Sequence, residues 1–62
     1  MTATITYKTP WGSELLKELV ESPEATSARD FLPVARSRQQ VFADALGLFW
    51  LHSIGITIKM EN

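Results

Sequence analysis

A chain of 62 residues with no cysteine and one histidine can form only one small domain, residues 1–62, without a disulfide framework or structural zinc site. An apolar content of 45% with two Trp, three Phe and one Tyr excludes a disordered chain, which needs low hydrophobicity and high net charge. The formal net charge of -1 argues against a strongly basic nucleic-acid binder and against an acidic DNA mimic.

Residues 2–8 alternate apolar side chains with Thr and Lys, and this period of two predicts a strand. Thr9 and Pro10 then resemble a helix N-cap followed by proline at the first helical position. The next segment places its large apolar residues on one helical face, so a helix is predicted over residues 10–22, ending before Pro23. These apolar residues are Trp11, Leu15, Leu16, Leu19 and Val20.

Ser27 and Asp30 resemble a helix-capping arrangement, but Pro33 would interrupt a helix that began at Ser27. We therefore predict a separate short turn over residues 27–32, with the main helix beginning at Pro33. Its amphipathic pattern extends from Val34 to His52.

The segment SIGITIKMEN alternates large apolar residues with small or polar ones and predicts a second strand. The predicted architecture is a small α+β single domain of order β-α-α-β, in which a two-stranded sheet packs on two helices. Two strands alone are marginally stable and leave both edges unpaired, so dimerisation could extend the sheet.

The long helix carries one line of residues at alternating steps of four and three, as in a short coiled-coil seam. The line consists of Val34, Arg38, Val41, Ala45, Leu48 and His52. The charge of Arg38 has two interpretations. Its aliphatic stem can cover the core while its head reaches water, or it can face another chain and set the choice of partner. The small side chain of Ala45 would allow another helix to approach closely and favours the second interpretation.

The end of the long helix holds two further candidate residues. His52 is either a near-core histidine favoured by the negative helix end or part of a pH-sensitive interface. Trp50 either anchors a partner or covers the first helix or the sheet. The predicted partner-binding residues are therefore Val34, Arg38, Val41, Ala45, Leu48, Trp50 and His52.

Catalytic patterns are not found in this sequence. His52 has only Asp30 and Asp44 as orienting carboxylates, and Asp44 lies two turns away on the same helix, which is poor triad geometry. The three glycines are far apart, so no phosphate-binding loop is predicted. We expect no catalytic residue, metal or cofactor.

Targeting signals are also not apparent. The N-terminal segment MTATITYKTP lacks a basic stretch followed by an apolar run. The uncharged run ALGLFWLHSIGITI is shorter than the roughly 20 residues of a spanning helix. The polar face of the long helix lacks the Lys and Arg excess of membrane-surface helices. We expect a cytoplasmic location and no membrane partner.

These features favour a non-enzymatic regulator, inhibitor or accessory subunit that binds another protein or its own copy, as a homodimer, through its long helix and a strand edge. The alternative is a dimeric DNA- or RNA-binding regulator, because Arg and Gln side chains can contact base edges and phosphates. Its candidate residues are Arg29, Arg36, Arg38 and Gln39. Arg36 and Arg38 project in nearly opposite directions from one helix, which argues against a continuous basic surface.

Overall fold

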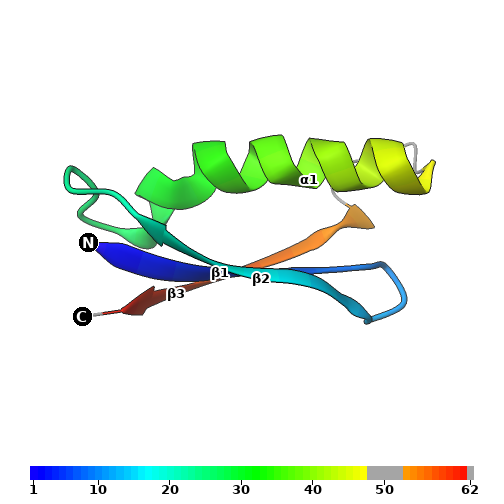
Figure 1. The fold of residues 1–62 in the computed structure, drawn as a ribbon, viewed down its shortest axis with the longest axis horizontal. Coiled ribbons are helices and arrows are strands. Elements are labelled where there is room, and N and C mark those ends of the chain that lie inside the picture. The colour runs from blue at the N-terminus through cyan, green and yellow to red at the C-terminus, as the bar shows by residue number, and fades with distance from the viewer. Residues whose placement is uncertain (48–52, 62) are drawn as a thin grey trace.

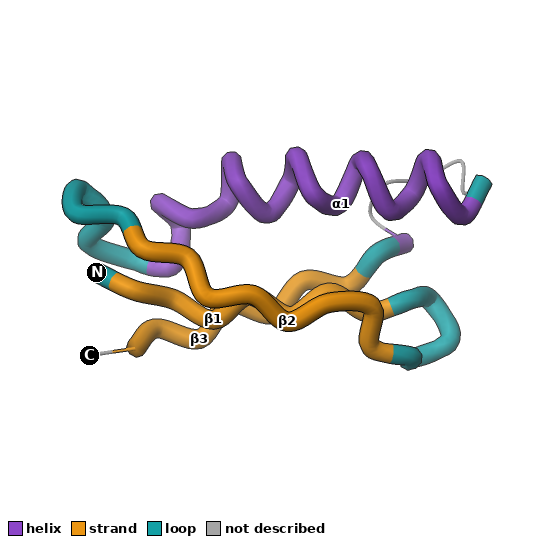
Figure 2. The backbone as a smooth tube through the Cα atoms, viewed as in Figure 1, coloured by secondary structure: helices purple, strands orange, loops and turns teal. Residues whose placement is uncertain are grey.

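The computed structural model describes residues 1–47 and 53–61. In chain order the elements are strands β1 (Thr2–Lys8) and β2 (Glu14–Glu21), the 3-10 helix η1 (Ala28–Phe31), the helix α1 (Leu32–Leu46) and strand β3 (Gly55–Glu61). The strands form one antiparallel sheet in the order β2-β1-β3. The helix α1 runs along one face of this sheet, and no described element covers the other face (Figures 1 and 2).

The predicted two-stranded sheet on two helices is wrong, because residues 14–21 form strand β2 where a helix was predicted. The leucines of this segment fit a helical spacing, but pairing with β1 gives them strand positions. Leu16 and Val20 lie opposite Tyr7 and Ala3 of β1 and are partly buried, whereas Leu19 is 71% exposed. Strand pairing has therefore overridden the local spacing, as tertiary context often does.

The predicted helix start at Thr9 and Pro10 is instead the loop of the β1–β2 hairpin. The Gly12 N–H donates to the Thr9 carbonyl at 3.0 Å, and the Ser13 N–H donates to the Thr9 Oγ1 at 2.9 Å. Pro10 occupies the second turn position, where its fixed φ is favourable. Gly12 has φ +93°, a left-handed conformation that glycine adopts without steric cost. Proline and glycine here direct a turn.

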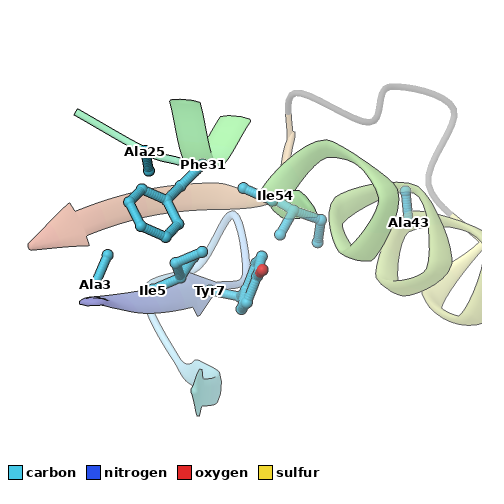
Figure 3. Close-up of a cluster of buried hydrophobic side chains, with 8 residues drawn as sticks. Ala3, Ile5, Tyr7, Ala25, Phe31, Ala43 and Ile54 are labelled. Carbon is cyan, nitrogen blue, oxygen red and sulfur yellow. The ribbon is translucent and has the colours of Figure 1, made fainter. Parts of the chain in front are cut away.

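The core lies between β1 and α1, where the predicted first strand is confirmed and its apolar residues are completely covered. Ala3, Ile5 and Tyr7 of β1 have no exposed surface. Figure 3 shows these side chains in one cluster with residues of the loop, η1, α1 and the segment before β3. The remaining buried apolar residues of this cluster are Ala25, Phe31, Ala35, Ala43 and Ile54.

The segment before α1 confirms the predicted separate turn, since η1 precedes a helix that carries Pro33 in its first turn. The Asp30 Oδ2 accepts the N–H groups of Thr26 at 2.7 Å and Ser27 at 3.0 Å. These bonds lower the pKa of the Asp30 carboxyl. The helix ends at Leu46 with Gly47 at φ +70°, earlier than the predicted end at His52.

Replacing Gly12 by alanine distinguishes the hairpin from the predicted helix. At a positive φ, Gly12→Ala should lower the free energy of unfolding by about 1–2 kcal/mol. In a helix the same change would raise it. Gly55→Ala is the matched control, because an added Cβ would meet only an ordinary contact with the Lys8 side chain, at 3.8 Å. Urea unfolding of both variants measures the difference, and a stabilised Gly12→Ala chain would contradict the hairpin.

Candidate functional site

An open depression of about 370 Å³ lies on α1 and is lined by Val34, Ser37, Arg38 and Val41, which we call the helix surface. Val34 is 43% exposed and Val41 is 58% exposed. The residues of α1 that are buried toward the sheet are smaller or polar, namely Ala35, Gln39 and Ala43. The helix therefore directs Ala35, Gln39 and Ala43 inward and leaves the larger apolar side chains of Val34 and Val41 on the outside.

The described part of the predicted seam lies on this exposed side. Ala45 is exposed, as are Val34, Arg38 and Val41. Leu48, Trp50 and His52 lie outside the described residues. The structure therefore places four members of the predicted partner-binding set on the outer side of α1, where none is part of the buried core.

Arg38 has a carboxylate partner within its own chain. Its Nη2 donates to the Glu18 Oε2 at 3.3 Å, and the other oxygen of that carboxylate, Oε1, accepts the Tyr7 hydroxyl at 2.8 Å. The Arg38 side chain remains 47% exposed, compared with 19% for Glu18. The sequence interpretation missed this pair because it predicted a helix over residues 10–22, which include Glu18. In strand β2, Glu18 lies opposite Ile5 and shares the sheet face that α1 covers.

Tyr7 connects this ion pair to the core. The side chain is completely buried, and its ring lies 5.5 Å from that of Phe42, centroid to centroid, at an angle of 54°. Burial raises the pKa of the Tyr7 hydroxyl, and its hydrogen bond to the Glu18 carboxylate raises it further. This network of three side chains, Tyr7, Glu18 and Arg38, thus connects the central strand β1 to β2 and α1, while the outer side of Arg38 stays accessible.

The residues of the nucleic-acid alternative do not form one exposed surface. Gln39 is 4% exposed, and its Nε2 donates to the Ile54 carbonyl at 2.7 Å, so it stabilises the interior. Arg38 is paired with Glu18, whereas Arg29 of η1 and Arg36 of α1 are exposed. The sequence interpretation placed Gln39 in this set because Arg and Gln side chains can contact base edges and phosphates.

The carboxylates considered for catalysis have local roles. Asp30 caps η1, and the Asp44 Oδ1 accepts the Gln40 Nε2 at 2.8 Å along the helix. Within residues 1–47 and 53–61, no three or more His, Cys, Asp or Glu side chains are grouped to hold a metal ion. No helix among the described residues has the length and apolar character needed to cross a membrane.

Comparison with known proteins adds no assignment: no family model, curated protein or solved structure matches this chain.

Tyr7 is the only tyrosine, so its ionisation can be followed by tyrosinate absorbance. In urea the hydroxyl should ionise near pH 10, and in the folded chain only at higher pH. Because folding raises the pKa of the Tyr7 hydroxyl, the protonated hydroxyl stabilises the folded chain. This contribution to the free energy of unfolding is complete below about pH 10 and is lost as the pH rises further.

The variant Tyr7→Phe supplies the control for this titration. Its free energy of unfolding should be about 1 kcal/mol lower than that of the wild type near neutral pH, because the hydrogen bond to Glu18 is lost. It should also lose less stability than the wild type above about pH 10. A folded wild-type chain whose tyrosine ionised near the ordinary pH would contradict the buried contact.

Proposed function

We propose that this chain is a non-catalytic protein-binding module, a small regulator, inhibitor or accessory subunit that acts by occupying the surface of another protein. Binding uses the helix surface together with the free edge of β2. The observation that carries the proposal is the exposure of Val34 and Val41 around one depression, with the Arg38 guanidinium beside them.

The composition of the helix surface is that of a small interface. Val34 and Val41 supply its apolar side chains, and Ser37 and Arg38 supply its polar groups. Protein interfaces combine an apolar centre with a polar rim and are enriched in arginine. Val34, Arg38 and Val41 follow the spacing i, i+4, i+7, which is how a helix presents its contacts to a groove on another protein.

Arg38 gives this surface a chemical preference. A guanidinium carries five N–H donors, and the hydrogen bond to Glu18 involves only the Nη2 nitrogen. Its exposed donors can bind a carboxylate of the partner, because guanidinium and carboxylate groups match in geometry. We therefore expect the partner to place an apolar side chain between Val34 and Val41, with an acidic residue next to it.

Capture of partners on the immobilised chain tests this proposal. Val41→Lys should weaken binding of the captured protein by about tenfold, because an apolar contact is replaced by a charge that must lose its water. Thr57→Lys is the matched control, since Thr57 is exposed on β3 and the added charge is the same. The partners are captured from a cell lysate that has been treated with nuclease, and the captured protein is identified by mass spectrometry. Urea unfolding confirms that both variants fold.

Equal capture by the wild type and Val41→Lys would contradict a role for the helix surface. Binding of the purified chain to mixed nucleic acid at low salt, with a steep loss as salt is added, would favour the nucleic-acid alternative.

A further inference from the structure

We propose that two copies of this chain pair through the free edge of β2, around a two-fold axis that places Leu19 of one copy opposite Leu19 of the other. This deepens the proposed function by naming a second copy as the occupant of the edge, and it rests on that function only in treating the edge as a binding surface. The edge is open because β2 has β1 on one side and no described strand on the other.

The backbone of β2 shows which groups face this open edge. Met1 and Ser22 exchange two N–H to carbonyl bonds, both of 2.8 Å, so they form a hydrogen-bonded pair of the β1–β2 ladder. Such pairs alternate with non-hydrogen-bonded ones along an antiparallel ladder. The alternation makes the pairs of β1 with Glu21, Leu19 and Lys17 non-hydrogen-bonded. The N–H and carbonyl groups of these three residues therefore point away from β1.

The same three residues place their side chains on the sheet face that α1 does not cover. Leu19, at 71%, has the largest exposed fraction of the described large apolar residues, and Lys17 and Glu21 on either side are also exposed. Neither of these charged residues has an ion-pair partner among the described residues. The edge thus displays a positive charge, an apolar side chain and a negative charge at successive same-face positions.

A two-fold axis at Leu19 satisfies all of these groups at once. It places Leu19 opposite its copy and each Lys17 opposite the partner's Glu21, and all three pairs have the outward backbone groups needed for hydrogen bonding. An axis at Lys17 or Glu21 would set like charges against each other. An axis at Glu18 or Val20 would also allow backbone hydrogen bonds, but it would place Leu19 opposite the partner's Lys17 or Glu21 and would form no opposite-charge pair on this face. The register is therefore unique among these residues.

Both ends of the β2 edge limit the length of the ladder, and its symmetry limits the contact to two chains. Pro23 lacks an N–H and cannot extend the ladder past Ser22. The register of β1 with β2 shifts between Tyr7 and Lys8, which marks the other end of regular pairing. The contact uses the same patch on both copies, so it closes on itself and produces a dimer.

The opposite edge, β3, offers a shorter match. By the same alternation its outward backbone groups belong to Ile56, Ile58 and Met60. An axis at Ile58 would place Thr57 opposite Lys59 on the uncovered face and would form no opposite-charge pair there. An axis at Met60 would pair Lys59 with the partner's Glu61, but β3 ends at Glu61, so only residues 59–61 of each strand would pair, compared with residues 17–21 of β2. The length of the paired segment therefore favours β2.

Sedimentation of the purified full chain, from micromolar to millimolar concentration, tests the dimer. The wild type should change from monomer to dimer across this range. Leu19→Lys should remain monomeric, because two lysines would meet at the axis, whereas the β3 control Thr57→Lys should still dimerise. Both positions are exposed in the monomer, and urea unfolding checks that both variants fold.

A charge exchange tests the register separately from the apolar contact. Lys17→Glu should raise the dimer dissociation constant by about tenfold, because two symmetry-related attractions become repulsions. Adding Glu21→Lys to the same chain should restore the wild-type value. The inference is overturned by a wild type that stays monomeric, by a dimer that Thr57→Lys abolishes, or by a double variant that is not restored.

Val41→Lys separates this inference from the proposed function. It should lose capture of a foreign protein and keep the dimer, and loss of the dimer in this variant would place the self-contact on the helix and overturn the β2 pairing. A dimer without any captured protein would contradict the role of the helix surface alone. Capture by a wild-type chain that never dimerises would contradict the β2 pairing alone.

Discussion

The central position of β1 is the constraint on which the rest of this structure depends. Its backbone groups bond to a strand on each side, and Ala3, Ile5 and Tyr7 are buried beneath α1, η1 and the loop that precedes η1. Only one layer covers these residues, so the helix must present a closely fitting underside. Ala35 and Ala43 provide it, and the bulk of the core comes from aromatic residues and from isoleucines of the strands and their flanks. The valines of α1 are consequently available for another use.

Two polar links fix the helix over the sheet. On one side Arg38 reaches Glu18 of β2, and on the other the Gln39 amide donates to the carbonyl of Ile54, just before β3. Directional bonds of this kind specify an orientation that a layer of alanines alone would leave poorly defined. The charge in the middle of the helix therefore has an internal explanation, although 47% of the Arg38 side chain stays exposed.

The parts of this fold that could be predicted were those with a strong local signal. Both strands with strict alternation were predicted from the sequence, and so was the interruption at Pro33. Residues 14–21 were misassigned because Leu15, Leu16, Leu19 and Val20 fit a helical face, whereas in the strand these residues are divided between the two faces of the sheet. The decision came from pairing with β1 across the hairpin loop, an interaction that the spacing within residues 14–21 does not contain. A proline and a glycine two residues apart, Pro10 and Gly12, were the overlooked turn signal.

The candidate site was predicted unevenly for a related reason. Helical spacing correctly grouped Val34, Arg38 and Val41 on one side, because spacing along a helix is a local property. Which side faces the core depends on where the sheet lies, and the sheet had been assigned too few strands. Gln39 was assigned to the surface and Glu18 to the wrong element for that reason.

The topology also sets the order in which this molecule can assemble. The β1–β2 hairpin closes over the short loop that contains Pro10, whereas β3 must find β1 across almost the whole chain, as in the hydrogen bond from Thr4 to Glu61, 57 residues apart. Closing the longer loop costs more chain entropy and contributes most to the contact order. The hairpin is therefore the natural nucleus, and one side of β1 stays open until the last strand arrives. During that interval the nascent sheet has two vacant edges, and docking of β3 onto one of them removes that edge as a site for pairing with another chain.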